Sequence, residues 1–411
     1  MRLWLKTALA AAVGLAIGIL LSRAGGGEVA DLLPRLSRVA VQVGRYAVFP
    51  VIFFGVVMST HELRSNGAAL RVYGRLALYV AGSSALLTVA GLASVLLLAP
   101  QRIPIVVIVE QAPRAPAGLI DIVAGTFPAN MFQALVGDGS MLLPLLALGF
   151  VLGAHLDFDD EAGHPVTELF ESLCRIFYQI NALVVELFWV AIVVIAAAAA
   201  VRLGGADLAL YRELLVVLAV AVGVLYLGVF PALLYLLGER TNPYRALYAA
   251  LGPALTGLVS GDSHVSLAAL VVHGRESFRL PRRVSATVFP LCTVFGRAGT
   301  ALVTGIGYLV VLRSYTSFEV TGEQLLFAAL FTFLLSFAAG AVPGLGALGS
   351  LTILWSLSGN GLADGPLIMQ PVLPLLTGAA VLLDVTTAAL IAHLVGRAEA
   401  EPGVAPPRPF A

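Results

Sequence analysis

One arginine stands in the middle of an apolar stretch and is the clearest candidate for a chemical role. Arg297 has only uncharged residues before it, from Val284 to Gly296, and after it, from Ala298 to Leu312. A guanidinium keeps its charge in any protein environment. Because charges inside apolar, membrane-like segments are functional by default, we expect Arg297 to bind a partner of opposite charge.

Two further polar groups interrupt apolar stretches elsewhere in the chain. Asp384 is the only acid between residues 366 and 396, and Asp262, Ser263 and His264 follow one another inside the apolar stretch 247–274. Asp384 is the natural partner of Arg297, because a paired charge costs far less to bury than a lone one. His264 keeps a proton-coupled function open, since histidine changes its charge near neutral pH.

The same triplet also raises an enzymatic reading, an intramembrane serine hydrolase with Ser263 as its nucleophile. Such a nucleophile needs a base within hydrogen-bond reach and a third group that orients the base. His264 directly follows Ser263, and Val265 stands where a Gly-x-Ser-x-Gly elbow requires glycine. We therefore expect a protein that is not an enzyme.

The composition is that of an integral membrane protein. Of the 411 residues 59% are hydrophobic and 12% are charged, and the mean hydropathy is +0.96, whereas soluble domains are about a quarter charged. The formal net charge is zero, so nucleic acid is not an expected partner. Cys174 and Cys292 lie in or beside apolar segments, and no disulfide is expected. The sequence has no metal-ligand spacing or cofactor motif, so no cofactor is expected.

Apolar stretches long enough to cross a bilayer recur along the chain. We predict an all-α, multi-pass membrane protein with eight spans, near residues 4–22, 41–61, 73–99, 139–156, 172–201, 214–238, 284–312 and 366–396. The first stretch resembles a signal peptide, but it has no clear cleavage site and is read as a retained span. Cytoplasmic loops collect arginine, which places the N-terminus inside. The same side is predicted for Arg64, Arg71 and Arg75 between the second and third spans, and for Arg240, Arg245, Arg275, Arg279, Arg282 and Arg283 around segment 247–274.

Two apolar segments are interrupted at their middle by small residues. Segment 247–274 contains "VSGDSHVS", and segment 325–363 contains "AAGAVPGLGALGS" and is twice the length of one span. A backbone can unwind at membrane depth only where it lines a cavity inside protein. We interpret both as re-entrant hairpins, each followed by a whole span, which makes the two units inverted repeats of the kind that form transporter binding sites.

Six stretches, in order, resemble the glutamate transporter family, the dicarboxylate/amino acid:cation symporters. They are "VFPVIFFGVVMS", "FPANMFQALVGDGSMLLPLLALGFVLGAHL", "SGDSHVSLAAL", "PLCTVFGRAGTAL", "AAGAVPGLGAL" and "DVTTAALIAHL". The resemblance implies a glutamate-transporter-like elevator fold with eight transmembrane helices and two re-entrant hairpins. It also implies a homotrimer in the cell (inner) membrane and a small-molecule substrate.

The resemblance also implies a division into domains. The expected parts are scaffold 1–70, a third span and outer loop 71–126 on the transport-domain side, scaffold 127–240, transport core 241–397 and a disordered tail 398–411.

This sequence departs from the family at the residues that hold ions and substrate. The family's Asn-Met-Asp in the seventh span is here Gly296-Arg297-Ala298. In the last span, Ala380, Leu376 and Leu373 stand where the family has an asparagine, an arginine and an aspartate. Asp384, Thr300 and Thr377 match the family. We therefore expect the usual sodium sites and amino-acid pocket to be altered.

Two hypotheses for Arg297 follow. In the first, Arg297 pairs with Asp384 and replaces the bound sodium ion; in the second, it binds an anionic substrate. A third reading, an anchor that never touches ligand, stays open. The expected substrate-binding residues are Asp262, Ser263, His264, Arg297, Thr300, Val342, Gly344, Gly346 and Thr377, and the expected charge-substitute pair is Arg297 and Asp384.

The predicted function is secondary transport of a small carboxylate or amino acid, without the usual sodium coupling. The coupling ion, a proton or sodium, stays open. Three other functions are considered: an ordinary sodium-coupled symporter, an anion-conducting protein and a non-transporting relative.

Overall fold

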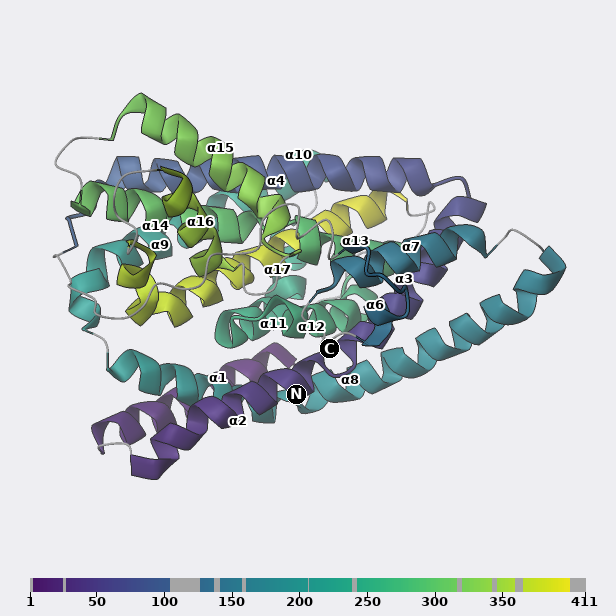
Figure 1. Ribbon diagram of the computed structural model, residues 1–411, viewed down its shortest axis with the longest axis horizontal. Coiled ribbons are helices and arrows are strands. Elements are labelled where there is room, and N and C mark those ends of the chain that lie inside the picture. Colours follow the sequence, from purple (N-terminus) through teal and green to yellow (C-terminus); the bar gives the residue numbers. More distant parts are fainter. Residues whose placement is uncertain are drawn as a thin grey trace.

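The computed structural model describes residues 3–24, 27–103, 126–136, 141–156, 160–205, 207–238, 242–315, 320–341, 346–358 and 365–399. Within these ranges every regular element is a helix (Figure 1). In chain order they are α1 Leu3–Arg23, α2 Gly27–Arg45, α3 Val48–Ser65, α4 Ala69–Leu98, α6 Gln133–Val136, α7 Leu143–His155, α8 Asp160–Gly204, the 3₁₀ helix η1 Leu208–Tyr211, α9 Arg212–Val224, the π-helical turn η2 Leu225–Val229, α10 Phe230–Leu237, α11 Tyr244–Ser260, α12 Ser263–Glu276, α13 Arg282–Phe295, α14 Ala298–Tyr315, α15 Gly322–Ala338, α16 Ala347–Ser358, the 3₁₀ helix η3 Gly365–Val372 and α17 Leu373–Ala398.

The prediction of an all-α, multi-pass membrane protein is confirmed. Among the described residues seven helical segments are long and apolar enough to cross a membrane, and they coincide with seven of the eight predicted spans. The exception is the span predicted at 139–156. There α7 has 13 residues and is about 20 Å long, shorter than the roughly 30 Å of hydrocarbon.

The second predicted span, 41–61, contains a break that the sequence did not indicate. The chain leaves the helix at Tyr46 and Ala47, between α2 and α3. The first of these helices is amphipathic, since charged residues such as Glu28 and Arg45 alternate with apolar ones. It was missed because its charges interrupt the apolar run by which spans are recognised.

Small residues let the first helix pack closely along the long helix α8. A Cβ atom at Gly14 would collide with the Val193 carbonyl, and one at Gly18 would collide with the Ala197 carbonyl. These two glycines are four residues apart and therefore share one face of α1. Small residues at this spacing are typical of close helix pairs in membranes.

The first broken segment is a helical hairpin. Helices α11 and α12 pack against each other and are joined by Gly261 and Asp262. Gly261 has φ +61°, a left-handed conformation that glycine adopts without strain. The 14 residues of α12 extend about 21 Å, so this arm is too short to cross a bilayer alone.

The seventh predicted span, 284–312, was expected to be one intact helix and is not. It consists of α13 and α14, and the helix is interrupted at Gly296 and Arg297. The expectation was wrong because apolar residues on both sides of a break look the same in sequence as one continuous span.

The second broken segment also contains two helices, α15 and α16, which contact each other. Thr321 caps α15 and forms a reciprocal capping box with Gln324. After this helix, a Cβ atom at Gly340 would collide with the carbonyls of Thr293 and Val294. The end of α15 therefore lies against the last turn of α13, next to the interruption.

The last helix, α17, runs through the middle of the molecule and packs against α11, α13 and α14 (Figure 1). The apolar window of Ile368–Ala398 is 83% buried and that of Arg282–Ser314 is 94% buried, against 22% for α1. The spans that carry Arg297 and Asp384 are therefore enclosed by protein. The predicted division into scaffold and transport core stays a prediction. At the predicted tail 398–411, Ala398 ends α17, Glu399 pairs with Arg75, and residues 400–411 lie outside the described residues.

Candidate functional site

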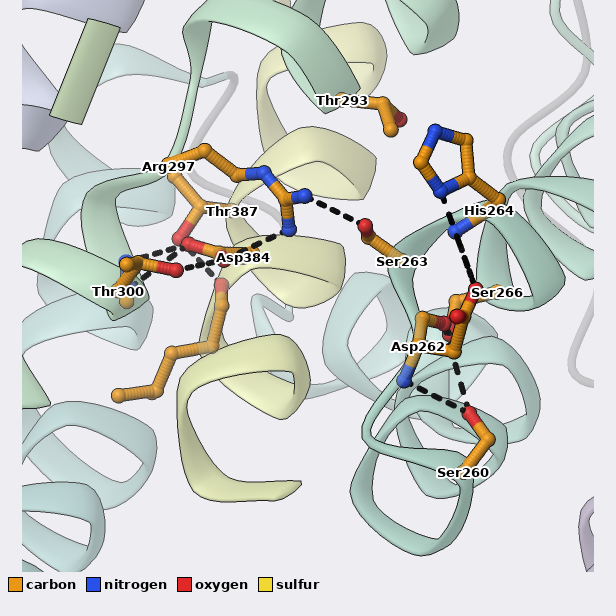
Figure 2. Close-up of polar contacts among 12 residues, drawn as sticks. Ser260, Asp262, Ser263, His264, Ser266, Thr293, Arg297, Thr300, Asp384 and Thr387 are labelled. Atoms are coloured by element: carbon orange, nitrogen blue, oxygen red, sulfur yellow. Dashed lines mark hydrogen bonds and ion pairs between the residues drawn. The ribbon is translucent and has the colours of Figure 1, made fainter. Parts of the chain in front are cut away.

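The carboxylate of Asp384, on α17, accepts hydrogen bonds from the N-terminus of α14. Its Oδ1 accepts hydrogen bonds from the Gly299 amide at 2.7 Å and the Thr300 amide at 3.1 Å. Its Oδ2 accepts from the Thr300 hydroxyl at 2.7 Å (Figure 2). A helix N-terminus carries unpaired N–H groups and a partial positive charge, so a carboxylate is stabilised there.

Gly299 permits this contact between the two helices. A Cβ atom at this position would collide with the Ala380 carbonyl and crowd Leu383 Cβ and the Asp384 amide. Any other residue would therefore push α14 away from α17 and lengthen the bonds to Asp384.

Arg297 occupies the interruption between α13 and α14, directly before the helix that Asp384 caps. Its Nη1 donates to Asp384 Oδ2 at 3.3 Å, and its Nη2 donates to Ser263 Oγ at 2.6 Å (Figure 2). Arg297 is 8% exposed and Asp384 is 5% exposed. The guanidinium therefore joins three separate parts of the chain: hairpin α11–α12, the broken seventh span and the last helix.

The pair of Arg297 and Asp384 is electrically neutral, and all the acceptor sites of the carboxylate are filled. Asp384 accepts four hydrogen bonds, two at each oxygen. A carboxylate offers about four lone-pair sites. A cation added at this carboxylate would have to displace Arg297 or one of the α14 donors.

The hairpin turn holds a second ion pair. Asp262 caps α12, because its Oδ1 accepts from the His264 and Val265 amides at 3.0 Å each. The same carboxylate pairs with Arg45, whose Nε donates to Oδ1 at 3.2 Å and whose Nη2 donates to Oδ2. The Asp262 carboxylate therefore binds both the first turn of α12 and Arg45 of α2.

The side chains of Ser263 and His264 point in different directions (Figure 2). Ser263 Oγ accepts from Arg297, and His264 Nδ1 lies 3.9 Å from Asp262 Oδ1. Among the described residues no hydrogen bond joins Ser263 to the imidazole, so the nucleophile-and-base arrangement of a serine hydrolase is not formed. His264 Nε2 is buried and has no partner in this part of the chain.

Thr377 lies apart from the Arg297 cluster, against the hairpin turn. Its hydroxyl donates to the Leu373 carbonyl at 2.8 Å, and a Cβ atom at Gly261 would lie 3.1 Å from it. Thr377 and Ser260 line a cavity of about 680 Å³ whose described walls come mainly from α1, α8, α11, η3 and α17. Neither Arg297 nor Asp384 is among those lining residues.

The remaining expected site residues belong to the second hairpin. Val342 and Gly344 lie outside the described residues. Gly346 is exposed at the start of α16. The structure thus brings Ser263, Arg297, Thr300 and Asp384 together and places Asp262 and His264 beside them.

Arg45 was missed by sequence reasoning. It stands at the C-terminal end of the amphipathic helix α2, 217 residues from its partner Asp262. The sequence shows a basic residue at the end of a helical stretch. This pattern does not indicate an ion-pair partner, because cations are favoured at helix C-termini in general.

The described residues contain no group of three or more His, Cys, Asp or Glu side chains that could hold a metal ion.

Comparison with known proteins relates the chain to a family and to a curated relative. A model of the sodium:dicarboxylate symporter family matches residues 3–398. A curated Caenorhabditis elegans protein, glt-4, whose name describes a sodium-dependent excitatory amino acid transporter, is 26% identical over 224 residues. That alignment covers 54% of this chain and 44% of the relative, so the chain matches less than half of the relative's length.

Proposed function

The chain belongs to the sodium:dicarboxylate symporter family, and from this premise we propose that it is a secondary transporter of a small carboxylate or amino acid. The proposed location is the cell (inner) membrane. The seven apolar helical segments and the enclosed polar cluster on interrupted helices support this function. Interrupted helices at membrane depth are where transporters build their sites.

We further propose that Arg297 replaces a coupling cation, so that transport does not require sodium at Asp384. The observation that carries this proposal is the neutral pair of Arg297 and Asp384, in which the carboxylate already accepts four hydrogen bonds. A sodium ion would compensate the same negative charge. A tethered guanidinium compensates it permanently, because it cannot lose its proton or dissociate.

The proposed movement is of the elevator type, and the proposed assembly is a homotrimer. Hairpin α11–α12, α13, α14 and α17 would move as one body, in keeping with their mutual packing and burial. The trimer is checked by native mass spectrometry, which should give three times the mass of the 42.8 kDa chain.

One observation favours the second role of Arg297, as a receptor for an anionic substrate. Arg297 Nε is buried without a partner among the described residues, and so is His264 Nε2. Buried polar atoms without partners are rare in native proteins. A substrate carboxylate beside Arg297 would satisfy the free Nε–H while the Asp384 bond persists.

The melting temperature of the purified protein distinguishes sodium-independent binding from that of an ordinary sodium-coupled symporter. It is measured in sodium chloride and in choline chloride, each with and without L-aspartate, because a ligand that binds only the folded state raises it. We expect sodium to give no increase over choline under either condition. A rise that requires sodium and aspartate together would identify an ordinary sodium-coupled symporter and overturn the proposal.

Uptake into proteoliposomes tests the transport itself. Radiolabelled dicarboxylates and amino acids are supplied in choline medium, and at least one should accumulate without sodium. An organic acid that raises the melting temperature of the wild type but not of Arg297→Met would establish the anion-receptor role. Uptake that is strictly dependent on sodium would contradict the cation replacement.

A further inference from the structure

A second cavity lies away from the Arg297 cluster, between α3, α8, α12 and α13. Its volume is about 420 Å³. Three arginines line it, Arg175 on α8, Arg275 on α12 and Arg282 on α13. Apolar side chains such as Ile52 and Pro290 form another part of its wall.

Two of the three arginines are matched by carboxylates. Arg282 pairs with Glu62 and, at 3.6 Å, with Glu171. Arg175 pairs with Glu171 at 2.7 Å. The charges of Arg175 and Arg282 are therefore balanced by these two acids, and α3, α8 and α13 are connected through them.

Arg275 is different. Its guanidinium carbon lies 4.8 Å from the centre of the Tyr178 ring, a cation–π contact. Within the described part of the chain no carboxylate forms an ion pair with Arg275. The hydroxyl of Tyr178 is buried and has no hydrogen-bond partner among the described residues.

We propose that this cavity binds a phosphate group. Arg275 is exposed and forms no ion pair among the described residues, so its planar N–H groups are available to match two phosphate oxygens at once. Tyr178 lines the same cavity, and its buried, unpartnered hydroxyl is a further donor beside Arg275. An anion with several acceptor oxygens can accept from both groups and also balances the charge of Arg275, which a neutral ligand does not.

The position of the cavity suggests two sources of the phosphate. The arginines around hairpin α11–α12 are on the side predicted to be cytoplasmic. Basic pockets between membrane helices on that side bind anionic lipid headgroups, and the apolar wall would accommodate the start of an acyl chain. A free phosphate in the aqueous phase has the same chemistry. Either ligand would contact α8 and α12 together and would hold these helices in their present relation.

The test uses the full-length protein and its melting temperature. In one arm the protein is in nanodiscs of phosphatidylcholine, with or without phosphatidylglycerol. In the other arm detergent-solubilised protein is titrated with inorganic phosphate at constant ionic strength. We expect the wild type to be stabilised in at least one arm, and Arg275→Gln to bind about tenfold more weakly, the loss expected for one charged hydrogen bond.

Two further variants make the result specific. Tyr178→Phe keeps the ring beneath Arg275 and removes only the hydroxyl, so it should weaken binding while the fold stays intact. Arg71→Gln changes an exposed arginine of α4 on the same predicted side and should behave like the wild type. Stabilisation in the lipid arm alone identifies a headgroup, and stabilisation by inorganic phosphate identifies a free anion. The proposal is overturned if neither ligand stabilises the wild type, or if the wild type and Arg275→Gln respond equally.

Discussion

Arg297 and Asp384 illustrate how a charge can be accommodated inside an apolar molecule. Each would cost several kcal/mol to bury alone. Together they are neutral, and the N-terminus of α14 supplies three further hydrogen bonds to the carboxylate. The mutual dependence of the two side chains has a thermodynamic consequence that can be measured.

Removal of both charges should destabilise the protein by less than the sum of the two separate removals. Arg297→Met leaves Asp384 buried without its counter-charge, and Asp384→Asn leaves Arg297 buried without its counter-charge. Each substitution should lower the free energy of unfolding by about 3–5 kcal/mol. The double variant has no unpaired charge and should cost clearly less than the sum of the two. The check is a double-mutant cycle on the free energy of unfolding in detergent. Additive costs would mean that the two charges do not interact.

At the scale of elements, the turn of hairpin α11–α12 is held by the carboxylate of Asp262, which makes two kinds of contact. Asp262 caps α12 through two backbone amides and pairs with Arg45 of α2. The cap is local to the hairpin, and the ion pair ties the hairpin to a distant helix. Two substitutions of different chemistry separate these contributions.

Asp262→Asn keeps an oxygen that accepts from the α12 amides but loses the charge for Arg45. Asp262→Ala loses both. We expect Asp262→Ala to be the less stable variant by about 1 kcal/mol, the usual worth of an N-cap. The measurement is the melting temperature, with hydrogen exchange at the His264 and Val265 amides. These amides should exchange faster in Asp262→Ala than in Asp262→Asn, and equal exchange in the two would show that the cap is unimportant.

At the scale of the whole molecule, the most buried spans are those that carry the polar cluster. The window of Arg282–Ser314 is 94% buried, whereas that of α1 is 22% buried. The proposed elevator movement would require this inner body to slide against the outer helices. The contact between α2 and α12 is the place to test it, because the two helices belong to different predicted domains.

A disulfide across this contact should stop transport. A Cβ atom at Gly44 would lie 3.1 Å from Val265 Cγ1, the position that a cysteine sulfur would take, once the Phe188 ring, 2.5 Å from the same Cβ, has moved aside. In a background without Cys174 and Cys292, oxidation of Gly44→Cys/Val265→Cys should abolish proteoliposome uptake, and a reductant should restore it.

The matched control joins α4 to α14, both on the predicted transport side. A Cβ atom at Gly305 would lie 3.7 Å from Leu92 Cγ, the position that a cysteine sulfur would take. Oxidised Leu92→Cys/Gly305→Cys should retain uptake. Full activity of the oxidised α2–α12 variant would exclude movement between these two helices.

The limits of sequence reasoning appear at particular residues. The partnership of Arg297 with Asp384 was predictable, because each is the only charge in its apolar segment. The partnership of Asp262 with Arg45 was not, because many arginines stand near helix ends. The interruption at Gly296 and the short helix α7 were also missed, since hydropathy records how apolar a stretch is and not whether its helix is continuous.

The amino-acid sequence by itself determined that this chain forms membrane helices, where most of them lie, and that two segments are broken. The physical reason is local: in a bilayer each helix must satisfy its own backbone hydrogen bonds, so a long apolar run has few alternatives. Only the tertiary structure decided that Asp384 caps α14, that Arg297 reaches Ser263, and that Arg45 holds the hairpin turn. These contacts join residues 34 to 217 positions apart, and no periodicity within one helix specifies which distant helix it will meet.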